Sequence, residues 1–281
     1  MSRARRLYAR HRPGARTRWL KRPALAPRPT CVFVTFARGQ EVSAHAVHHL
    51  RAWTDAGWQT VVVVVSDDPA RVRCRDQLAS ADAVLLRLNS GYDFGAWSDA
   101  LRRLGPKLRD LPLLATVNDS VFGPLRSFPA MLRTVQETSA DVIGLTESRE
   151  LGRHLQSYLL FFKARALREP VFDLFWRSVR PGDRQFVIDH YETQLLPIME
   201  QAGLTCASLF PLTEGVATNP TLQGWRALIE AGFPYVKVEL LRRNPFGADL
   251  TGWRALLATE GYDPAIAEAY LRTLPDAIRL D

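Results

Sequence analysis

Cysteine is scarce in this sequence, and long apolar runs are missing from it. The three cysteines, Cys31, Cys74 and Cys206, lie far apart and form no CxxC pair. This spacing argues against a disulfide framework or a zinc knuckle, so we expect thiols in the core. No window approaches the roughly 18 apolar residues needed to cross a bilayer, and no apolar segment of the secretory type opens the chain. These absences predict a cytoplasmic protein.

Several common catalytic and nucleotide-binding motifs are also missing. The chain has no GxGxxG after its first apolar run, and no GxxxxGK[ST], GxSxG or HExxH. Each of these motifs carries a defined chemistry, namely dinucleotide binding, phosphate cradling, serine nucleophilic attack and zinc proteolysis. Their absence argues against a standard dehydrogenase, a P-loop NTPase, a serine hydrolase of the usual α/β type and a zinc protease.

Acidic residues are absent from the first 30 positions. That segment holds nine Arg and one Lys, whereas the whole chain has a net charge of +8, so the rest sums to −2. With four prolines and few aliphatic side chains, residues 1–29 are expected to form a basic mobile tail. Such a tail suits peripheral contact with the inner face of the cell membrane, although a solvated leader fits equally. A rival hypothesis is a non-catalytic nucleotide- or nucleic-acid-binding protein acting through this tail.

After the tail, apolar β-branched runs alternate with helical patterns. The runs at 31–36, 60–66, 83–88, 113–119 and 141–146 are continuously apolar, which indicates strands covered on both faces. The sequence therefore predicts an α/β fold with a mainly parallel sheet flanked by helices over residues 30–245. Residues 246–281 read as a helical C-terminal extension packed on the same domain.

Ligands of open parallel sheets bind at the carboxyl ends of the strands. The residues that follow the predicted strands are therefore the candidate site. They include Thr35, Phe36, Ser66, Asp67, the stretch "RLNSGYDFGAW" (87–97), Asn118 and Asp119.

Two carboxylates stand out among these and later residues. Asp119 leaves a buried strand within "NDSVFGP", where an acid is costly unless it binds a cation or accepts hydrogen bonds, so it is a candidate for Mg²⁺ or Mn²⁺; an Asx-type turn is the alternative. Glu192 falls on the apolar face of a predicted helix with Ile188 and Leu195. Partial desolvation is one way in which proteins tune a carboxylate for general-base work, and a structural ion pair with an arginine is the alternative.

The three histidines His45, His48 and His49 form an HxxHH cluster on another predicted helix. An i, i+4 histidine pair can hold a metal ion, but no glutamate lies between them to act as a base. We interpret the cluster as a half-solvated helix face.

Five stretches in a fixed order, "RLNSGYDFGAW", "NDSVFGP", "HLQSYLLFF", "HYETQL" and "GFPYVKVELLRRNP", resemble the rhamnan synthesis protein F family of bacterial polysaccharide glycosyltransferases. The similarity covers roughly residues 31–245. It implies a GT-A-like fold that binds a nucleoside-diphosphate sugar, often a rhamnose donor, and transfers the sugar to a lipid-linked cell-surface glycan such as O-antigen or capsule. A different sugar or a retaining mechanism stays open.

The resemblance also implies roles for individual residues. Glu192 is the expected base, and Asp119 is the expected partner of a metal ion or of the donor diphosphate. Asn118 and Ser120 flank Asp119, so a two-carboxylate DxD motif is absent, which puts metal dependence in doubt. The expected donor-binding residues are Thr35, Phe36, Ser66, Asp67, Arg87, Asn89, Gly91, Asp93, Asn118, Lys237 and Arg242. The expected acceptor-binding residues are His154, Gln156, Ser157 and Tyr158.

Overall fold

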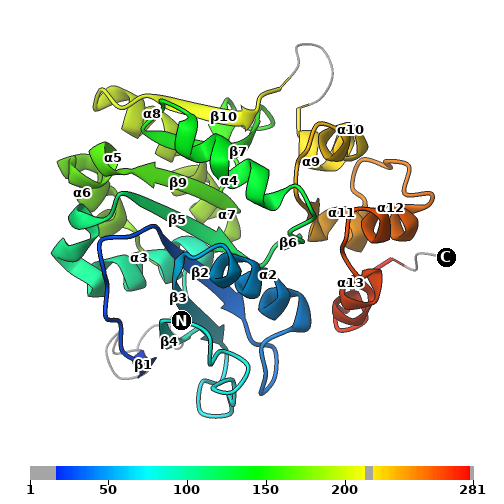
Figure 1. The fold of residues 1–281 in the computed structure, drawn as a ribbon, viewed down its shortest axis with the longest axis horizontal. Coiled ribbons are helices and arrows are strands. Elements are labelled where there is room, and N and C mark those ends of the chain that lie inside the picture. Colours follow the sequence, from blue (N-terminus) through cyan, green and yellow to red (C-terminus); the bar gives the residue numbers. More distant parts are fainter. Residues whose placement is uncertain (1–16, 213–217, 279–281) are drawn as a thin grey trace, which may run out of the picture.

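A twisted sheet forms the centre of the molecule (Figure 1). The computed structural model describes residues 17–212 and 218–278. Its strands run in the order β1-β4-β3-β2-β5-β9-β7-β10, with β8 paired to β7. The strands are β1 (Arg18–Lys21), β2 (Thr30–Phe36), β3 (Gln59–Ser66), β4 (Ala83–Leu88), β5 (Leu113–Asn118), β7 (Val142–Ser148), β8 (His154–Leu155), β9 (Leu159–Lys163) and β10 (Cys206–Phe210).

The four central strands β4, β3, β2 and β5 are mutually parallel, as are β7 and β10. The strands β1 and β9 run antiparallel to their neighbours. This confirms the predicted α/β class with a mainly parallel central sheet. The carboxyl ends of the central strands therefore meet at one edge.

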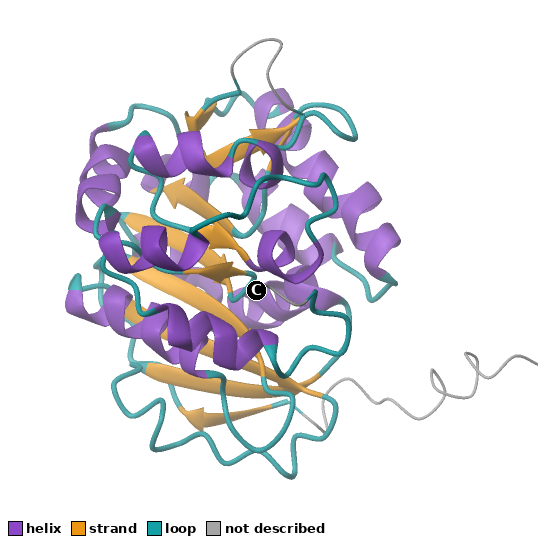
Figure 2. Cartoon of the chain, turned by 90° about the vertical axis from the view of Figure 1, so that its right-hand side faces the viewer, coloured by secondary structure: helices purple, strands orange, loops and turns teal. Residues whose placement is uncertain are grey.

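Helices cover both faces of this sheet (Figure 2). They are α2 (Ala44–Asp55), α3 (Tyr92–Leu104), α4 (Phe128–Glu137), α5 (Ala164–Arg168), α6 (Pro170–Ser178), α7 (Arg184–Val187) and α8 (Thr193–Gln201). A 3-10 turn at Gly105–Asp110 follows α3, and a π-helical segment at Ile188–Glu192 joins α7 to α8.

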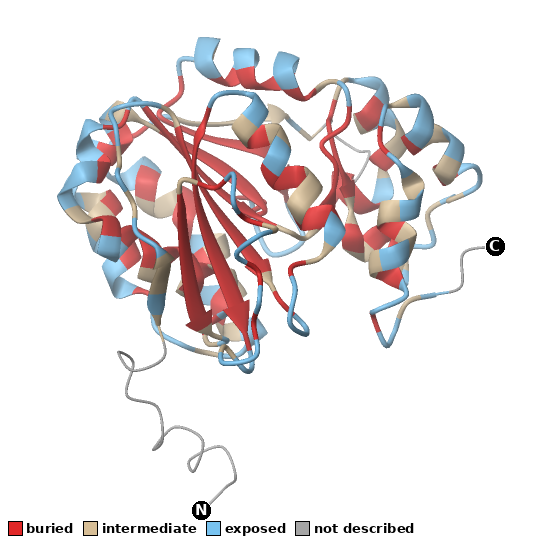
Figure 3. Cartoon of the chain, turned by 60° about the horizontal axis from the view of Figure 1, so that its bottom comes forward, coloured by how far each residue is buried: buried red, intermediate tan, exposed pale blue. Residues whose placement is uncertain are grey.

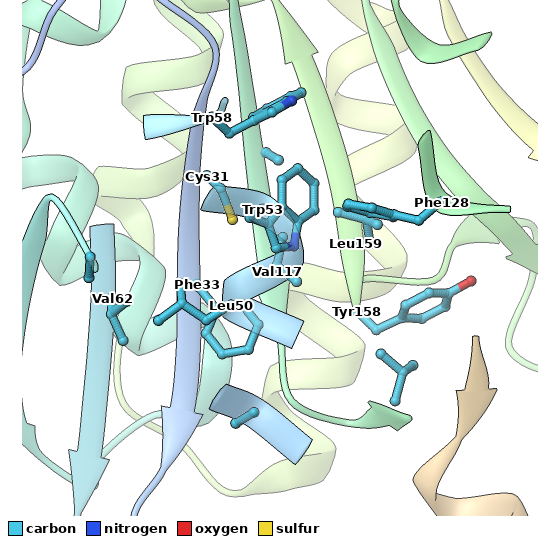
Figure 4. Packing of buried hydrophobic residues seen from close by; sticks show 14 of the residues in the cluster. Cys31, Phe33, Leu50, Trp53, Trp58, Val62, Val117, Phe128, Tyr158 and Leu159 are labelled. Atoms are coloured by element: carbon cyan, nitrogen blue, oxygen red, sulfur yellow. The ribbon is translucent and has the colours of Figure 1, made fainter. Parts of the chain in front are cut away.

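Alternation along each strand divides the core into two layers. In β2, Cys31 and Phe33 pack toward α2 and α4, whereas Val32 and Val34 pack toward α3, α6 and α8. Every strand in the centre is buried (Figure 3) because both of its faces are covered. Figure 4 shows the α2 side, where Trp53 lies among Trp58, Phe128 and other apolar side chains. This explains the continuous apolarity of the strand sequences.

A third cluster of buried apolar residues lies beside the carboxyl edge of the sheet. It joins the two-stranded antiparallel sheet of β6 (Val121–Phe122) and β11 (Val236–Lys237) to five helices. These helices are α9 (Pro220–Gln223), α10 (Trp225–Glu230), α11 (Val238–Arg243), α12 (Trp253–Thr259) and α13 (Pro264–Leu271). The last two, orange to red at the right of Figure 1, occupy the region expected to be a helical extension.

The expectation that residues 1–29 form a mobile tail is wrong for its second half. Residues 18–21 form the edge strand β1, in which Trp19 pairs with Leu85 of β4. Trp19 and Leu25 also pack against the core cluster on the α3 side, which gives this basic segment the burial that its composition seemed to lack. Residues 1–16 lie outside the described part of the chain.

Candidate active site

A cleft of about 530 Å³ opens at the carboxyl edge of the sheet. Its walls come from the start of α3, the end of β5, the β8–β9 region, the π-helical segment and α11, and residues of the C-terminal helices complete the rim. Ten residues singled out from the sequence line this cleft: Asp93, Asn118, Asp119, His154, Gln156, Ser157, Tyr158, Glu192, Lys237 and Arg242.

The stretch 87–97 forms a tight entry into α3. Gly91 adopts φ +73°, and a Cβ there would lie 3.3 Å from the Cα of Pro181. A Cβ on Gly95 would lie 2.7 Å from the carbonyl oxygen of Ser90, which real Cβ atoms almost never do. The two glycines therefore let the chain turn and pack closely at the cleft.

The aromatic residues of this stretch divide between the core and the cleft. Phe94 and Trp97 are buried, and Phe94 stacks on Trp176 and Tyr191. Tyr92 is 48% exposed on the cleft wall and has φ +52°, a conformation that is rare for a bulky residue. Such backbone strain concentrates at functional sites.

Asp93 follows Tyr92, and Asn118 holds its carboxyl group. Asn118 Nδ2 donates to Asp93 Oδ2 at 2.7 Å, while the amide and hydroxyl of Ser120 both donate to Asn118 Oδ1. The pKa of Asp93 is raised to about 7, chiefly by burial and next by the nearby Asp119 carboxylate, while the Asn118 hydrogen bond opposes the rise. Asp93 thus changes its charge near neutral pH, as acid–base groups of active sites often do.

Asp119 is fixed from both sides. Its Oδ2 accepts hydrogen bonds from the Thr35 hydroxyl at 2.7 Å and from the Phe36 amide at 3.0 Å. Its carbonyl oxygen lies 2.9 Å from Nε2 of His45. The structure gives Oδ1 no hydrogen bond among the residues it describes. One carboxylate oxygen is therefore held in place, and the other is left for a ligand.

The interpretation of the histidine cluster as a half-solvated face is wrong for two of its members. His45 and His49 are almost fully buried, and His49 Nε2 lies 2.9 Å from the Tyr235 hydroxyl. Burial lowers the pKa of His45 and lowers that of His49 strongly, so both are neutral. Because a carbonyl oxygen only accepts, His45 carries its proton on Nε2 and supports the backbone of Asp119.

Glu192 lies at the end of the π-helical segment, a local widening often found at functional sites. The amide of Ser157 donates to Glu192 Oε1 at 3.1 Å, and the hydroxyl of Ser157 donates to the same oxygen at 2.7 Å. Oε2 has no hydrogen-bond partner among the described residues. The structural alternative, an ion pair with an arginine, is not observed for Glu192 in the described part of the chain.

Lys237 reaches the cleft because β11 pairs with β6. Lys237 pairs with Val121, and the Val238 amide donates to the Ser120 carbonyl oxygen, which brings this strand beside Asp119. The Lys237 ammonium lies 4.1 Å from the centre of the Tyr158 ring. Burial lowers the pKa of Lys237 to about 8, while the carboxylates of Glu192 and Asp93 oppose the fall.

A network of polar side chains extends from Tyr158 along the cleft. The hydroxyls of Thr146 and Tyr158 lie 2.7 Å apart, and Thr146 also donates to Gln156 Oε1. Gln156 Nε2 donates to Asn219 Oδ1 at 3.3 Å, and Asn219 Nδ2 donates to Glu150. Amides and hydroxyls held in this way can donate to and accept from sugar hydroxyl groups.

His154 also lines the cleft. It is almost fully buried, and its Nδ1 lies 2.9 Å from the carbonyl oxygen of Gly152. Because a carbonyl oxygen only accepts, Nδ1 carries a proton and donates it to this oxygen.

Seven residues expected to bind the donor do not line this cleft. Asn89 Nδ2 donates to Asp67, and the buried Arg87 forms an ion pair with Asp99 at 2.9 Å and donates to the Ser90 carbonyl oxygen. These contacts hold the turn before α3 in place. The seven residues are Thr35, Phe36, Ser66, Asp67, Arg87, Asn89 and Gly91.

Other residues that line the cleft were not predicted from the sequence. Arg184 lines the cleft and has no hydrogen bond or ion pair with a described residue. Arg38, Asn219, Phe246 and Tyr270 line it as well. All of these residues lie outside the five matched stretches, in loops, in a short helix or in the C-terminal region, and Phe246 directly follows the last stretch. Arg242, which was predicted to neutralise phosphate, lines the cleft but is paired to Asp276 at 3.0 Å.

The side chains of the cleft offer few ligands for a metal ion. Within residues 17–212 and 218–278, no three His, Cys, Asp or Glu side chains come together as a metal site. The free oxygen of Asp119 suits an ion that takes most of its ligands from water and from a substrate diphosphate, as Mg²⁺ commonly does. The described residues of the cleft do not form a metal site in which side chains supply all the ligands.

The chain is similar to proteins of one family over most of its length. The profile of the family described as "Rhamnan synthesis protein F" matches residues 62–251, more than half of the chain. The chain belongs to the rhamnan synthesis protein F family. The matched range contains every lining residue that was predicted from the sequence.

Two groups of relatives were found. "Virulence protein VirA" of Vibrio anguillarum is 29% identical over 206 residues, covering 61% of this chain and 66% of that protein. "Uncharacterized protein y4gN" of Sinorhizobium fredii is 27% identical over 155 residues, covering 53% and 40% respectively. The chain therefore spans less than two thirds of the length of these relatives.

A solved structure of a proposed nucleotide-diphospho-sugar transferase from Desulfovibrio desulfuricans is also similar. The match covers 88% of this chain and 99% of that one, with a TM-score of 0.41 and 13% identity. Similarity at this level carries no argument about function. No helix among the described residues is long and apolar enough to cross a membrane.

Proposed function

We propose that this protein transfers a sugar from a nucleoside-diphosphate sugar to a glycan acceptor, and that the cleft is its active site. The observation that carries the proposal is the meeting of Asp93, Asp119 and Glu192 with Lys237 at the carboxyl edge of the sheet. Carboxylates supply a base, and the cation suits a diphosphate. Family membership gives the reaction class.

In the proposed inverting reaction, Glu192 Oε2 accepts the proton of the acceptor hydroxyl. The hydroxyl oxygen attacks the anomeric carbon, and the bond from that carbon to the diphosphate oxygen breaks. Ser157 holds the other carboxylate oxygen through two hydrogen bonds, so the base is oriented before the acceptor arrives.

Cationic side chains on one side of the cleft stabilise the negative charge that develops on the leaving diphosphate. Lys237 and Arg184 both line this side, and the carboxylates of Glu192 and Asp93 favour the charged form of Lys237 by raising its pKa. Asp119 would hold Mg²⁺ or Mn²⁺ when such an ion binds, and that ion would neutralise charge on the diphosphate. Thr35 and the Phe36 amide keep Asp119 in place for this role.

The finer assignment is a rhamnosyltransferase. The family description names a rhamnan, which supports L-rhamnose as the sugar, with dTDP-L-rhamnose as the donor. The acceptor is a cell-surface polysaccharide such as O-antigen or capsule, extended at the cytoplasmic face of the membrane. The amide and hydroxyl wall around Gln156 and Asn219 would receive the acceptor sugar.

Release of nucleoside diphosphate tests this function. The full chain is incubated with dTDP-L-rhamnose and with UDP- and GDP-hexoses, each with and without a lipid-linked glycan extract and each with and without Mg²⁺. We expect release from one donor that depends on the extract and disappears in Glu192→Gln. Release that is unchanged in Glu192→Gln would contradict the proposed base, and no release from any donor would contradict the proposed reaction.

A further inference from the structure

A second hollow lies at the far end of α3. It measures about 240 Å³, and we name it the basic pocket. Tyr92 and Asp93 at the start of α3 line the cleft, whereas Arg103 and Leu104 at its end line the basic pocket. A helix of this length spans about 20 Å at ~1.5 Å per residue. The basic pocket is lined by Trp19, Arg22, Pro23, Leu25, Arg103, Leu104 and Lys107.

Two segments that are far apart in the sequence build the basic pocket. The strand β1 pairs antiparallel with β4, with Lys21 opposite Val84 near the start of that strand. Lys21 Nζ also donates to the carbonyl oxygens of Ala79 and Ala81, which anchors the end of β1. The helix α3 and the 3-10 turn after it end at the same edge of the sheet. The pairing thus places the basic residues of the N-terminal segment beside those that follow α3.

The cations of the basic pocket are unpaired. Arg22, Arg103 and Lys107 are exposed, and their side chains form no hydrogen bond or ion pair with a described residue. No acidic residue lines the basic pocket. Their positive charges therefore remain available to an anion from outside. The C-terminal end of α3 tolerates this concentration because the helix dipole is negative there.

Apolar surface accompanies this charge. Trp19 and Leu25 are half-buried, pack on the core cluster at one side and line the basic pocket at the other. An indole with an apolar body and a polar N–H suits the boundary between lipid headgroups and acyl chains. Cations set around such a side chain match the phosphates of anionic lipids.

We propose that the basic pocket binds the phosphate groups of an anionic membrane surface. The cleft lies at the other end of α3, so this contact leaves the cleft open to donor and acceptor. The proposal does not depend on the reaction assigned to the cleft, because it uses only the charges and the apolar surface at the opposite edge of the sheet.

Vesicle co-sedimentation of the full chain tests the proposal. Vesicles of phosphatidylcholine alone are compared with vesicles that also contain phosphatidylglycerol, for the wild-type chain, for Arg22→Glu/Arg103→Glu/Lys107→Glu and for the milder set Arg22→Gln/Arg103→Gln/Lys107→Gln. The control is Arg71→Glu/Arg75→Glu/Arg133→Glu, three exposed cations that line neither hollow. The Arg-rich residues 1–16 are present in every variant, so a difference between variants reports on the basic pocket.

We expect binding to the anionic vesicles only. The glutamine set should bind about 100-fold more weakly, since each cation near an anionic surface contributes about a factor of five. The glutamate set should not bind, and the control should bind like the wild-type chain. Raising NaCl from about 0.1 M to about 1 M should release the wild-type protein because the screening length falls from about 10 Å to about 3 Å.

Three results would overturn the proposal. Equal binding by the glutamine set and the wild-type chain would move the contact elsewhere, with residues 1–16 as the next candidate. Displacement from vesicles by inorganic phosphate at micromolar concentration would assign the basic pocket to a free anion. Tighter binding to a single-stranded oligonucleotide than to the vesicles, lost in the same variants, would make the partner a nucleic acid. Unchanged thermal unfolding confirms that each variant is folded.

Discussion

The two ends of α3 arrange cationic side chains in opposite ways. At the cleft, Lys237 is half-buried, lies over the Tyr158 ring and is close enough to Glu192 and Asp93 for their charges to change its pKa. At the basic pocket, Arg103 and Lys107 are exposed and unpaired within the described chain. A buried charge among fixed partners suits selective chemistry, whereas exposed charges without partners suit a broad anionic surface.

Loss of the base should give the largest effect. Glu192→Gln removes the group that accepts the proton, so we expect transfer to fall by about 10²- to 10⁴-fold. Donor affinity should stay within about twofold, because Ser157 can still donate to the amide oxygen. The rate constant and the donor dissociation constant are measured separately. Glu137→Gln, an exposed position on α4, is the matched control. A variant with normal transfer would remove Glu192 from the reaction.

The next largest effect should distinguish Lys237 at the cleft from Lys107 at the basic pocket by their contribution to donor binding. Lys237→Met should weaken donor binding by about 10- to 100-fold, the usual scale for a hydrogen bond to a charged group. Lys107→Met, at the basic pocket, should leave it unchanged. Because the pKa of Lys237 is lowered to about 8, its positive charge is present below that pH and is lost above it.

Titration calorimetry from pH 6 to about pH 9 checks this prediction. Donor affinity of the wild-type chain should fall as the pH rises through 8, and Lys237→Met should lack that fall. Equal effects of the two lysine substitutions would contradict the distinction between the cleft and the basic pocket.

Asp93→Asn should change stability in a pH-dependent way. The pKa of Asp93 is raised to about 7 in the folded chain, so the folded state binds a proton that the unfolded state releases near its ordinary value of 3.8. This contribution is fully present below pH 3.8 and is lost as the pH rises through 7.

The asparagine variant should therefore be more stable than the wild-type chain at pH 8, by on the order of 2 kcal/mol. It should also lose the decline in stability between pH 4 and pH 7. Urea unfolding at several pH values measures both effects, with Asp110→Asn, at an exposed position of the 3-10 turn after α3, as control. A decline that persists in Asp93→Asn would locate the titrating group elsewhere.

A further effect on stability concerns the close packing at the start of α3. Alanine usually stabilises a helix relative to glycine, but a Cβ at position 95 meets the Ser90 carbonyl oxygen at 2.7 Å. Gly95→Ala should therefore lower the free energy of unfolding by about 1–3 kcal/mol. Gly39→Ala, which has nothing within 4 Å of its Cβ, should change it by less than about 1 kcal/mol. Thermal unfolding distinguishes the two, and a more stable Gly95→Ala would contradict the packing argument.

Much of the fold could be predicted from the sequence because a strand that is buried on both faces has a continuously apolar sequence. The continuous apolar run at 60–66 corresponds to β3, which lies between β4 and β2 and is buried throughout. The strand β1 could not be predicted in this way. Its four residues include two cations, and it is stabilised by pairing with β4, by the burial of Trp19 and by the hydrogen bonds of Lys21.

The site could be predicted where a residue follows a strand, and less well elsewhere. Asn118 and Asp119 follow β5, so topology alone directs them to the carboxyl edge. Arg184 and Asn219 reach the cleft through loops and short helices whose positions depend on tertiary packing. The burial of His45 and His49 could not be predicted, because the sequence does not show which group will pair with a buried polar side chain. In the structure these partners are the Asp119 carbonyl oxygen for His45 and the Tyr235 hydroxyl for His49.

Ligand-dependent thermal unfolding of the full chain tests most directly whether the cleft binds a nucleotide sugar. Nucleoside diphosphates and nucleotide sugars are added singly, with and without Mg²⁺ or Mn²⁺, to the wild-type chain and to Lys237→Met. A ligand at ~100 times its dissociation constant adds about 2.7 kcal/mol, enough to raise the midpoint by several degrees. We predict such a rise with one nucleotide class, much reduced in Lys237→Met. No rise with any of them, or the same rise in both proteins, would contradict the assignment of the cleft.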